Sequence, residues 1–360
     1  MQAQPTDDPG IEALRGIAAL MVVGAHYLPL LTGTPGSWAF TSTGVDLFFV
    51  LSGFVFGPYL FEKRLQVLPH VVRRFFRMYP LYIVALCLYA VLKEPASGAW
   101  EHFGVHVLMA HTLQSKEIAF FYNAAFWSLP PEVEFYALLP LLGLVSRRLG
   151  FAPLLLFAMA SHMLLAFWPA PAAGEASLRS LAAVHAPGLL IEFLLGTLGF
   201  AIAQRIRTAK TGRAGWLLFL LGLAALVAAW LVFAHYLAHP PSSTQGIPNW
   251  VSGNMGLMAA VGYMLVTAAI ANRGHYAPQA LTIFFVWAGR LSYGIYLLHS
   301  AALTLVERYA PAITGLAAAA SALLLTVATA WLAHKLIEGP CREYGRSLSK
   351  RIANKRLANQ

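Results

Sequence analysis

Long apolar stretches separated by short polar segments dominate the hydrophobic pattern of this chain. Stretches long enough to cross a membrane as helices lie at 12–31, 43–61, 78–92, 126–146, 151–168, 186–203, 216–236, 250–271, 282–305 and 312–336. An eleventh apolar stretch, 100–113, is short and contains three histidines. Because only helices and closed barrels can satisfy their backbone polar groups in lipid, the pattern predicts an all-α polytopic membrane bundle of about ten transmembrane helices.

The distribution of lysine and arginine predicts how this bundle is oriented. If the amino terminus is cytoplasmic and 100–113 does not cross, eighteen basic residues face the cytoplasm, in 62–77, 147–150, 204–215, 272–281 and after 337. The outer side keeps only Lys93, Lys116, Arg179 and Arg308. A crossing at 100–113 would destroy this positive-inside bias. We therefore expect both termini in the cytoplasm and 100–113 as a re-entrant or outer interfacial segment.

Composition agrees with a membrane protein and narrows the class of partner. The chain is 58% hydrophobic and 11% charged, with a mean hydropathy of +0.63, whereas soluble domains carry about 25% charged residues. Topology and anionic lipid account for the formal charge of +10, so we expect no nucleic-acid partner. The acidic start lacks the basic region of a signal peptide, which predicts a retained first span. Residues 1–341 then form one membrane domain, followed by a basic cytoplasmic tail at 342–360.

His26 lies inside the first apolar stretch, eleven positions after Arg15. Eleven helical steps return to within about 20° of the starting direction and span roughly 16 Å, about half of a membrane core. Ionisable groups are costly in hydrocarbon and mark polar cavities, and a neutral imidazole can take a proton from a hydroxyl. A lone histidine that only hydrogen-bonds a neighbouring helix is an equally good interpretation.

Three arginines begin the third apolar stretch. Arg73 and Arg77 are four residues apart and Arg74 and Arg77 three, so on a helix their side chains lie close together. Guanidinium groups match phosphate geometry, so the cluster could hold a cytosolic ligand with several phosphates. Taken alone, arginines in this position favour the alternative of an anchor to lipid headgroups.

Polar residues also enter the membrane from the outer side. Trp127 and Ser128 open the fourth stretch, where Ser128 is placed to cap the helix, and Glu132 and Tyr136 then share one face. The carboxylate of Glu132 could orient the His26 imidazole. Further polar positions are Asp46, which could also cap its helix, and Ser52 in the second stretch, and a stripe of Ser292, Tyr296 and His299 in the ninth.

Six strings together resemble the acyltransferase-3 family of integral membrane O-acyltransferases, over nearly the whole chain. They are EALRGIAALMVVGAH at 12–26, GVDLFFVLSGF at 44–54, RRFFRMYP at 73–80, WSLPPEVEFY at 127–136, GRLSYGIYLLH at 289–299 and IEGP at 337–340. Departures from the family pattern are Glu12 and Ala13, where Asp-Gly is usual, and Pro130 with Pro131. The additional carboxy-terminal SGNH domain of some members is absent from these 360 residues, which suggests a stand-alone membrane module.

The resemblance implies roles for the residues already singled out. Acyl-coenzyme A, with acetyl as the expected acyl group, would be the donor substrate, and no permanently bound cofactor or metal is implied. Its phosphates would lie near Arg15, Arg73, Arg74 and Arg77. His26 would be the general base with Glu132 as its orienting partner. Residues expected to bind the acceptor are Asp46, Ser52, Trp127, Ser128, Tyr136, Tyr293 and His299.

The acceptor implied by the family is a hydroxyl of a carbohydrate or lipid-linked glycan at the outer side of the bacterial inner membrane. An oligomer is compatible with the sequence. Alternatives are transfer of a succinyl or longer acyl group, a proton-coupled secondary transporter, or a lipid-scaffolding role. The outer segments 93–125, 169–185 and 237–249 should select the acceptor. Their histidines fit no zinc pattern, and we expect them to be solvated at the interface: His102, His106, His111, His185, His235 and His239.

Overall fold

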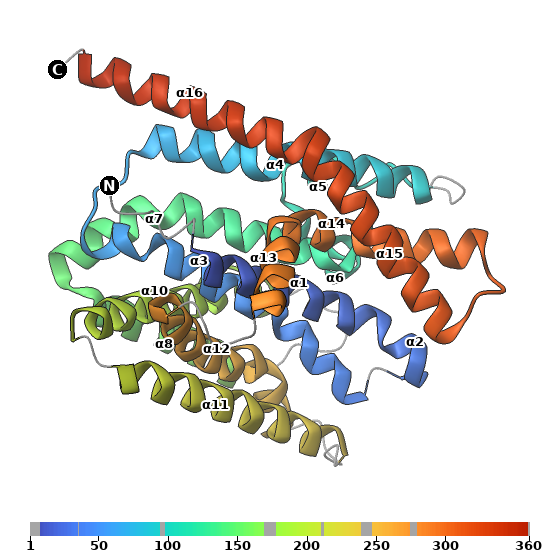
Figure 1. Cartoon of the computed structure of the whole chain (residues 1–360), viewed down its shortest axis with the longest axis horizontal. Coiled ribbons are helices and arrows are strands. Elements are labelled where there is room, and N and C mark those ends of the chain that lie inside the picture. Colours follow the sequence, from blue (N-terminus) through green and yellow to red (C-terminus); the bar gives the residue numbers. More distant parts are fainter. Residues whose placement is uncertain are drawn as a thin grey trace.

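The computed structural model describes residues 8–34, 36–93, 98–168, 178–209, 212–238, 247–273 and 279–358. Every regular element within these ranges is helical, which confirms the predicted all-α bundle (Figure 1). The longer helices are α1 (Pro9–Tyr27), α3 (Gly44–Phe61), α4 (Val67–Lys93), α7 (Leu129–Leu149), α8 (Phe151–Phe167), α10 (Ala186–Ala209), α11 (Gly212–Ala238), α12 (Ile247–Arg273), α13 (Gln279–Arg290), α14 (Ser292–Tyr309), α15 (Gly315–Ala333) and α16 (Gly339–Ala358).

Short helical pieces join the long helices. The stretch 100–113 contains only α5 (Phe103–Val107) and the single turn His111–Leu113, which are too short to cross a membrane. The remaining short elements are α2 (Pro29–Thr32), α6 (Lys116–Ala119), α9 (Leu178–Ala183), and 3₁₀ turns at Gly36–Thr43 and Ala124–Ser128. The segment between α4 and α7 is therefore built of short turns, as expected for a segment that does not span.

Each of the ten predicted stretches overlaps helices, but fewer than ten meet the requirements for a full span. In the described part of the chain, seven helical stretches are long and apolar enough to cross a membrane, or eight if α13 and α14 form one bent span. The 17 residues of α8 reach only about 26 Å. The two ends of α7 carry Glu132 and Glu134, and Arg147 and Arg148. The chain is a multi-pass membrane protein in which these two helices are the least typical spans.

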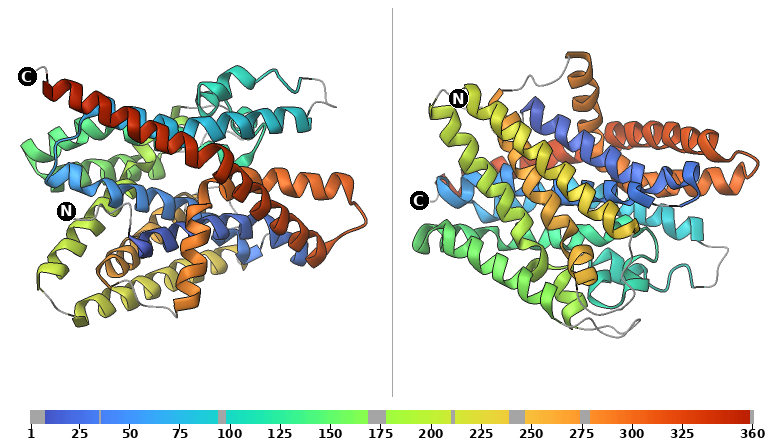
Figure 2. Two further views of the ribbon diagram at one scale, coloured as in Figure 1. Left: turned by 45° about the horizontal axis from the view of Figure 1, so that its top comes forward. Right: turned by 90° about the horizontal axis from the view of Figure 1, so that it is seen from below.

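The predicted span 282–305 is broken. α13 and α14 meet at an angle of 73°, and α13 packs across α1, as the upright orange helix in Figure 2 (left) shows. Two glycines allow this crossing: a Cβ on Gly289 would lie 1.8 Å from the Glu12 carbonyl oxygen, and one on Gly16 2.3 Å from that of Phe285. Small residues at such a contact let two backbones approach closely. The crossing fixes α1, which carries both Arg15 and His26.

The last helix of the chain does not stop at the predicted end of the span, residue 336. α15 continues through a π-helical turn, His334–Glu338, into α16, so that one helical stretch runs over 41 residues, from Gly315 to Lys355. At 1.5 Å per residue this is about 60 Å, roughly twice the thickness of a hydrocarbon core. α16 packs along α4, beside which it runs in Figures 1 and 2. Residues 342–358 are thus an ordered helix against the membrane domain.

Candidate active site

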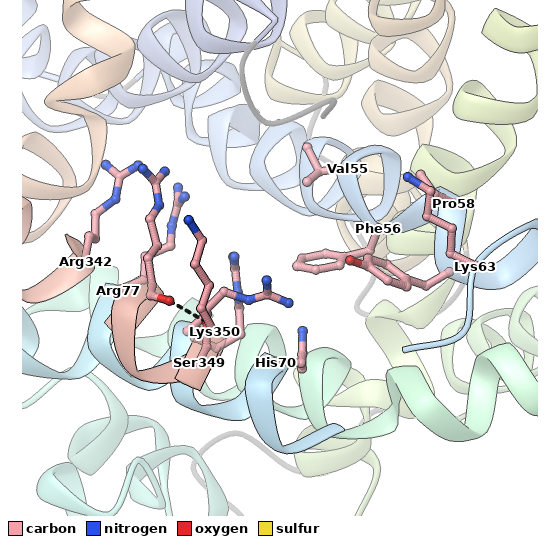
Figure 3. A pocket seen from close by; sticks show the side chains of 13 residues that line it. Val55, Phe56, Pro58, Lys63, His70, Arg77, Arg342, Ser349 and Lys350 are labelled. Atoms are coloured by element: carbon pink, nitrogen blue, oxygen red, sulfur yellow. Dashed lines mark hydrogen bonds between the residues drawn. The ribbon is translucent and has the colours of Figure 1, made fainter. Parts of the chain in front are cut away.

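A cavity of about 300 Å³ lies between α3, α4 and α16 and is lined by many cations (Figure 3). Seven basic residues line it, namely Lys63, Arg73, Arg74, Arg77, Arg342, Arg346 and Lys350. No acidic side chain is among the described residues that line the cavity. Such a concentration of positive charge is stable only with counter-charge, so the cavity is suited to a ligand with several negative charges.

Helical periodicity explains why these cations converge. Arg73 and Arg77 repeat at four residues along α4, and Arg342, Arg346 and Lys350 repeat at four along α16. The two faces meet because α16 packs on α4. Figure 3 shows Arg77 and Arg342 side by side, with Lys63 and Phe56 on the opposite wall. The spacing within 73–77 predicted the first half of this cluster, and the second half comes from the segment predicted to be a cytoplasmic tail.

Two lining side chains leave polar atoms unpaired. Arg74 Nε and His70 Nε2 are buried and have no hydrogen-bond partner within the described part of the chain. The Arg74 guanidinium carbon lies 5.0 Å from the Phe56 ring centroid and 5.3 Å from that of Tyr136, so aromatic faces hold the group in place. A buried N–H without a partner is costly, and an oxygen atom of a bound anion would satisfy that of Arg74 Nε.

A second, smaller cavity of about 60 Å³ begins at Arg77, which lines both spaces. Its polar lining includes Arg15, Ser52 and Glu132. Ser52 Oγ donates to Glu132 Oε1 at 3.1 Å, and the Tyr136 hydroxyl donates to the same oxygen. Arg15 is buried and pairs with Glu12 at 2.5 Å. The structure therefore brings Arg15, Arg77 and Glu132 together around one polar space inside the bundle.

Three further predicted residues line this smaller cavity. Ser128, Tyr136 and Tyr293 line it, and Tyr293 OH donates to the Met78 carbonyl at 2.7 Å. Ser128 stands at the amino-terminal cap of α7, but its hydroxyl bonds the Ala125 carbonyl and the Tyr296 hydroxyl. The predicted capping bond of Ser128 is therefore wrong. Trp127 packs edge-on against Phe49, with ring centroids 6.3 Å apart.

His26 has its ring held by the main chain and by a second histidine. Its Nδ1 lies 2.9 Å from the Val22 carbonyl oxygen. Because that oxygen can only accept, Nδ1 carries the hydrogen and Nε2 carries the free lone pair. The ring of His299 lies edge-on, with its centroid 4.8 Å away, and Tyr296 joins His299 to the smaller cavity. Nε2 of His26 is therefore the nitrogen available to accept a proton.

The predicted pairing of Glu132 with His26 is not what the structure shows. The hydrogen bonds of Glu132 within the described residues go to Ser52 and Tyr136, and that of His26 goes to Val22. Geometry explains the difference: an i−4 carbonyl of the same helix is always within reach of a histidine Nδ1, whereas Glu132 enters from α7 beside α3. The catalytic roles expected for His26 and Glu132 stay predictions, with the main-chain carbonyl as the group that orients the imidazole.

Asp46 lies elsewhere. Its side chain shares a hydrogen bond with Glu192 of α10, and a Cβ on Gly256 of α12 would lie 2.2 Å from Asp46 Oδ1. Asp46 lines none of the cavities described here. Two carboxyl groups in hydrogen-bond contact share a proton, so the pair joins α3 to α10 and α12. Sequence analysis missed Glu192, because nothing in its apolar surroundings on α10 signals a partner.

The expectation of solvated outer histidines is wrong for three of the six. His106 and His111 are fully buried, with parallel rings 4.3 Å apart, and buried His185 bonds Glu134. Burial and the neighbouring His106 lower the pKa of His111 to about 4. His235 is exposed, His102 is half-buried, and His239 lies outside the described residues. The short turns between α4 and α7 pack against the main core of the bundle, where the Tyr82 hydroxyl donates to the His106 carbonyl, and this packing removes the rings from water.

Comparisons with known proteins agree with this geometry. The acyltransferase-domain profile of the acyltransferase-3 family matches residues 8–335. α16 lies beyond the matched region. A curated relative, "Protein 2 in picA locus" from Rhizobium radiobacter, is 39% identical over 84 residues, which cover 22% of this chain and 42% of that relative. No solved structure matches the chain.

The family match covers nearly the whole membrane domain and contains the residues that line the smaller cavity. The chain belongs to the acyltransferase-3 family and is a multi-pass membrane protein.

Proposed function

We propose that the protein moves an acyl group, acetyl in the first instance, from acyl-coenzyme A in the cytoplasm to a hydroxyl of a carbohydrate or lipid-linked glycan at the outer side of the bacterial inner membrane. The observation that carries this proposal is the cavity lined by seven cations and by no acidic side chain of the described residues, which shares Arg77 with the lining of a smaller space inside the bundle. Coenzyme A combines several phosphates with a long, thin arm, which suits a wide charged entrance followed by a narrow interior.

Each part of the donor has a counterpart in the chain. The phosphates would lie against Arg73, Arg74, Arg77 and the cations of α16, and a phosphate oxygen would accept from the unpartnered Nε–H of Arg74. The arm would pass Arg77 toward Glu132 and Arg15. The volume of the smaller cavity, about 60 Å³, favours a short acyl group over a long one. The positive-inside bias supports the cytoplasmic placement of the charged entrance.

The transfer step needs one base. The acceptor hydroxyl oxygen attacks the thioester carbonyl carbon while its proton passes to His26 Nε2. The carbon–sulfur bond then breaks, and the coenzyme A thiolate takes the proton back from the imidazolium, so that neither protons nor electrons are gained or lost. Val22 holds Nδ1–H throughout, which keeps the lone pair on Nε2. Glu132, bonded to Ser52 and Tyr136, supplies negative charge close to Arg15 and Arg77 and organises the passage between the cavities.

The direct test uses the purified protein in proteoliposomes. Radiolabelled acetyl-coenzyme A on the cytoplasmic side should yield labelled glycan or lipid-linked saccharide, and mass spectrometry of the product reports acyl group and acceptor together. His26→Ala protein, reconstituted in the same amount, is the control. Label in the product at equal rates with both proteins would contradict the proposal, and a succinyl or longer mass on the product would identify another acyl group.

A further inference from the structure

A third cavity, of about 440 Å³, lies at the opposite end of α4 from the cation-lined entrance. Its lining comes from the last turn of α4, the turns before α7 and the end of α14. Arg77 and Lys93 stand sixteen residues apart on α4, so the two cavities are separated by about 24 Å along the helix. The volume falls within the range of small-molecule sites, so the cavity can hold a ligand of one or two sugar rings.

Basic residues cluster at this cavity, although the outer side of the protein is expected to carry few of them. Of the four basic residues expected there, Lys93 and Arg308 line the cavity and Lys116 covers one of its rings, Phe120, at 5.7 Å. Lys93 Nζ lies 4.5 Å from the Phe121 centroid, and Arg308 Nη2 donates to the Leu92 carbonyl at 2.7 Å. Neither Lys93 nor Arg308 has an ion pair with a described carboxylate. Both cations are held by these contacts, and neither is neutralised by a carboxylate of the described residues.

Aromatic rings form the wall beside these cations. Phe120, Phe121 and Tyr122 are consecutive, and the Phe121 and Tyr122 rings stand perpendicular at 4.9 Å. The Tyr122 hydroxyl donates to the Ala99 carbonyl at 2.6 Å, which fixes that ring. Rigid aromatic faces pack against the apolar C–H faces of pyranose rings, while cations bind an attached anionic group. This combination distinguishes a saccharide site from a site for a purely ionic ligand.

Hydrogen bonds connect the cavity to the catalytic histidine pair. Tyr89, at the cavity, accepts from Asn123 Nδ2 at 3.0 Å, and Ser300 Oγ donates to Asn123 Oδ1 at 3.1 Å. Ser300 Oγ also lies 3.2 Å from His299 Nε2, and the His299 ring contacts that of His26. The cavity is therefore linked through hydrogen-bonded polar groups to His299, whose ring contacts that of His26.

We propose that this outer cavity is the acceptor site and that it selects saccharides carrying an anionic group, a uronic-acid carboxylate or a sugar phosphate. The proposal rests on the acyl-transfer function above, because it supplies the second substrate of that reaction. Phe120 and Phe121 contact the sugar ring, Lys93 and Arg308 bind its anion, and Tyr89 lies on the side of the cavity from which hydrogen bonds lead toward His299.

Equilibrium binding to the purified protein tests the site, with saturating coenzyme A present to block the cation-lined entrance. The probes are trigalacturonic acid, glucose 1-phosphate and neutral maltotriose, and phosphatidylglycerol added to the micelles is the competitor. At least one anionic probe should bind about tenfold or more tighter than maltotriose. Lys93→Gln should remove most of that difference. Arg179→Gln, an equal charge change on the same side and away from the cavity, should leave it intact.

Three results would overturn the site: maltotriose binding as tightly as both anionic probes, Lys93→Gln and Arg308→Gln both binding like the wild type, or phosphatidylglycerol binding there while no saccharide does. A separate readout is labelled acetyl transfer to the anionic saccharide. Binding as expected without any transfer would refute the acyl-transfer function and leave the saccharide site standing. If Lys93→Gln and Arg179→Gln transferred acetyl with the same acceptor KM, the acceptor site would be refuted and the acyl-transfer function would stand.

Discussion

The two ends of α4 carry cavities of different character. At the amino-terminal end, seven cations surround a space with few aromatic walls, and helices α3 and α16 supply its other sides. At the carboxyl end, two lining cations stand beside three consecutive aromatic residues. The first arrangement suits a ligand that brings several negative charges, and the second suits a ligand with one charge and apolar faces. A single helix thus separates two cavities that differ in charge density as well as in position.

The largest effect is expected for the residue between the two cavities. His26→Ala should lower kcat for acyl transfer by about 10²–10⁴, the usual contribution of a general base, because the Nε2 lone pair that accepts the hydroxyl proton is lost. Steady-state kinetics with both substrates saturating measure this loss, and coenzyme A binding should be unchanged. If the loss caused by His26→Ala disappeared at saturating acyl-coenzyme A, His26 would act in donor binding and not in the proton transfer.

Arg77 distinguishes the donor side from the acceptor side. Arg77→Gln removes a charge that lines both inner cavities, and loss of a charge-assisted contact of 1.5–3 kcal/mol corresponds to about a 10- to 100-fold increase in KM for acyl-coenzyme A. Arg179→Gln is the matched control, and the acceptor KM should not change in either variant. If Arg77→Gln left the KM for acyl-coenzyme A unchanged, the arginine cluster would be an anchor to lipid headgroups and not a donor site.

Glu132→Gln tests which pair performs the proton transfer. Since Glu132 bonds Ser52 and Tyr136 and not His26, the substitution should lower kcat by about tenfold, through the disturbed passage, without altering the pH dependence of kcat. The measurement is a pH–rate profile beside that of the wild type. If the profile shifted along the pH axis, the carboxylate would be coupled to the base, as first expected from the sequence.

A smaller effect is expected at the α16 side of the entrance. Arg346→Gln should raise the KM for acetyl-coenzyme A by about three- to tenfold, more at low salt than at high salt, since one of seven clustered charges is lost. A short acetyl thioester without phosphates, acetyl-N-acetylcysteamine, provides the internal comparison and should be used equally well by both proteins. An equal loss with that thioester would show that α16 supports the fold and not the donor.

Acidic pH should weaken saccharide binding at the outer cavity more than coenzyme A binding at the cation-lined cavity. His106 packs edge-on against Tyr122 at 4.7 Å and stacks on His111, and the charge of His185 also acts on His111. Because the pKa of His111 is lowered to about 4 in the folded protein, the unfolded chain binds more protons between about pH 6.5 and 4, and stability falls as pH drops through that range.

Binding of the anionic saccharide should therefore decline between pH 7 and 5, while coenzyme A binding should change less. His111→Gln, which keeps a polar group but cannot titrate, is expected to flatten the pH dependence of the thermal midpoint in detergent. If the thermal midpoint of His111→Gln depended on pH as that of the wild type does, groups other than His111 would cause the pH dependence.

The sequence predicted the features that local spacing determines. The ten apolar stretches all fall on helices, Arg73 and Arg77 share a face because of helical periodicity, and the stripe of Ser292, Tyr296 and His299 is buried. Spacing could not predict which helices pack together. A basic segment such as 342–358 is equally compatible with water and with a cavity wall, and only its packing on α4 decides.

The partners of individual side chains were also beyond prediction. The His26–Glu132 pair was reasonable in chemistry, but it required two helices to meet at heights that the sequence does not specify. The break between α13 and α14 depends on how Gly289 meets Glu12, a contact between residues 277 positions apart. Burial of His106 and His111 likewise depends on how several short turns stack, for which periodicity offers no guide.

The close crossing at Gly16 and Gly289 also bears on how such an enzyme can diversify. It fixes α1, and this one helix sets the positions of both Arg15 and His26. A single residue inserted between them would rotate the imidazole about the helix axis by about 100°. The outer cavity takes its lining from α4, α14 and the turns before α7, and none of these belongs to α1. If the outer cavity binds the acceptor, as proposed above, substitution at positions such as Phe120 or Lys93 can change acceptor preference without altering the helix that carries His26.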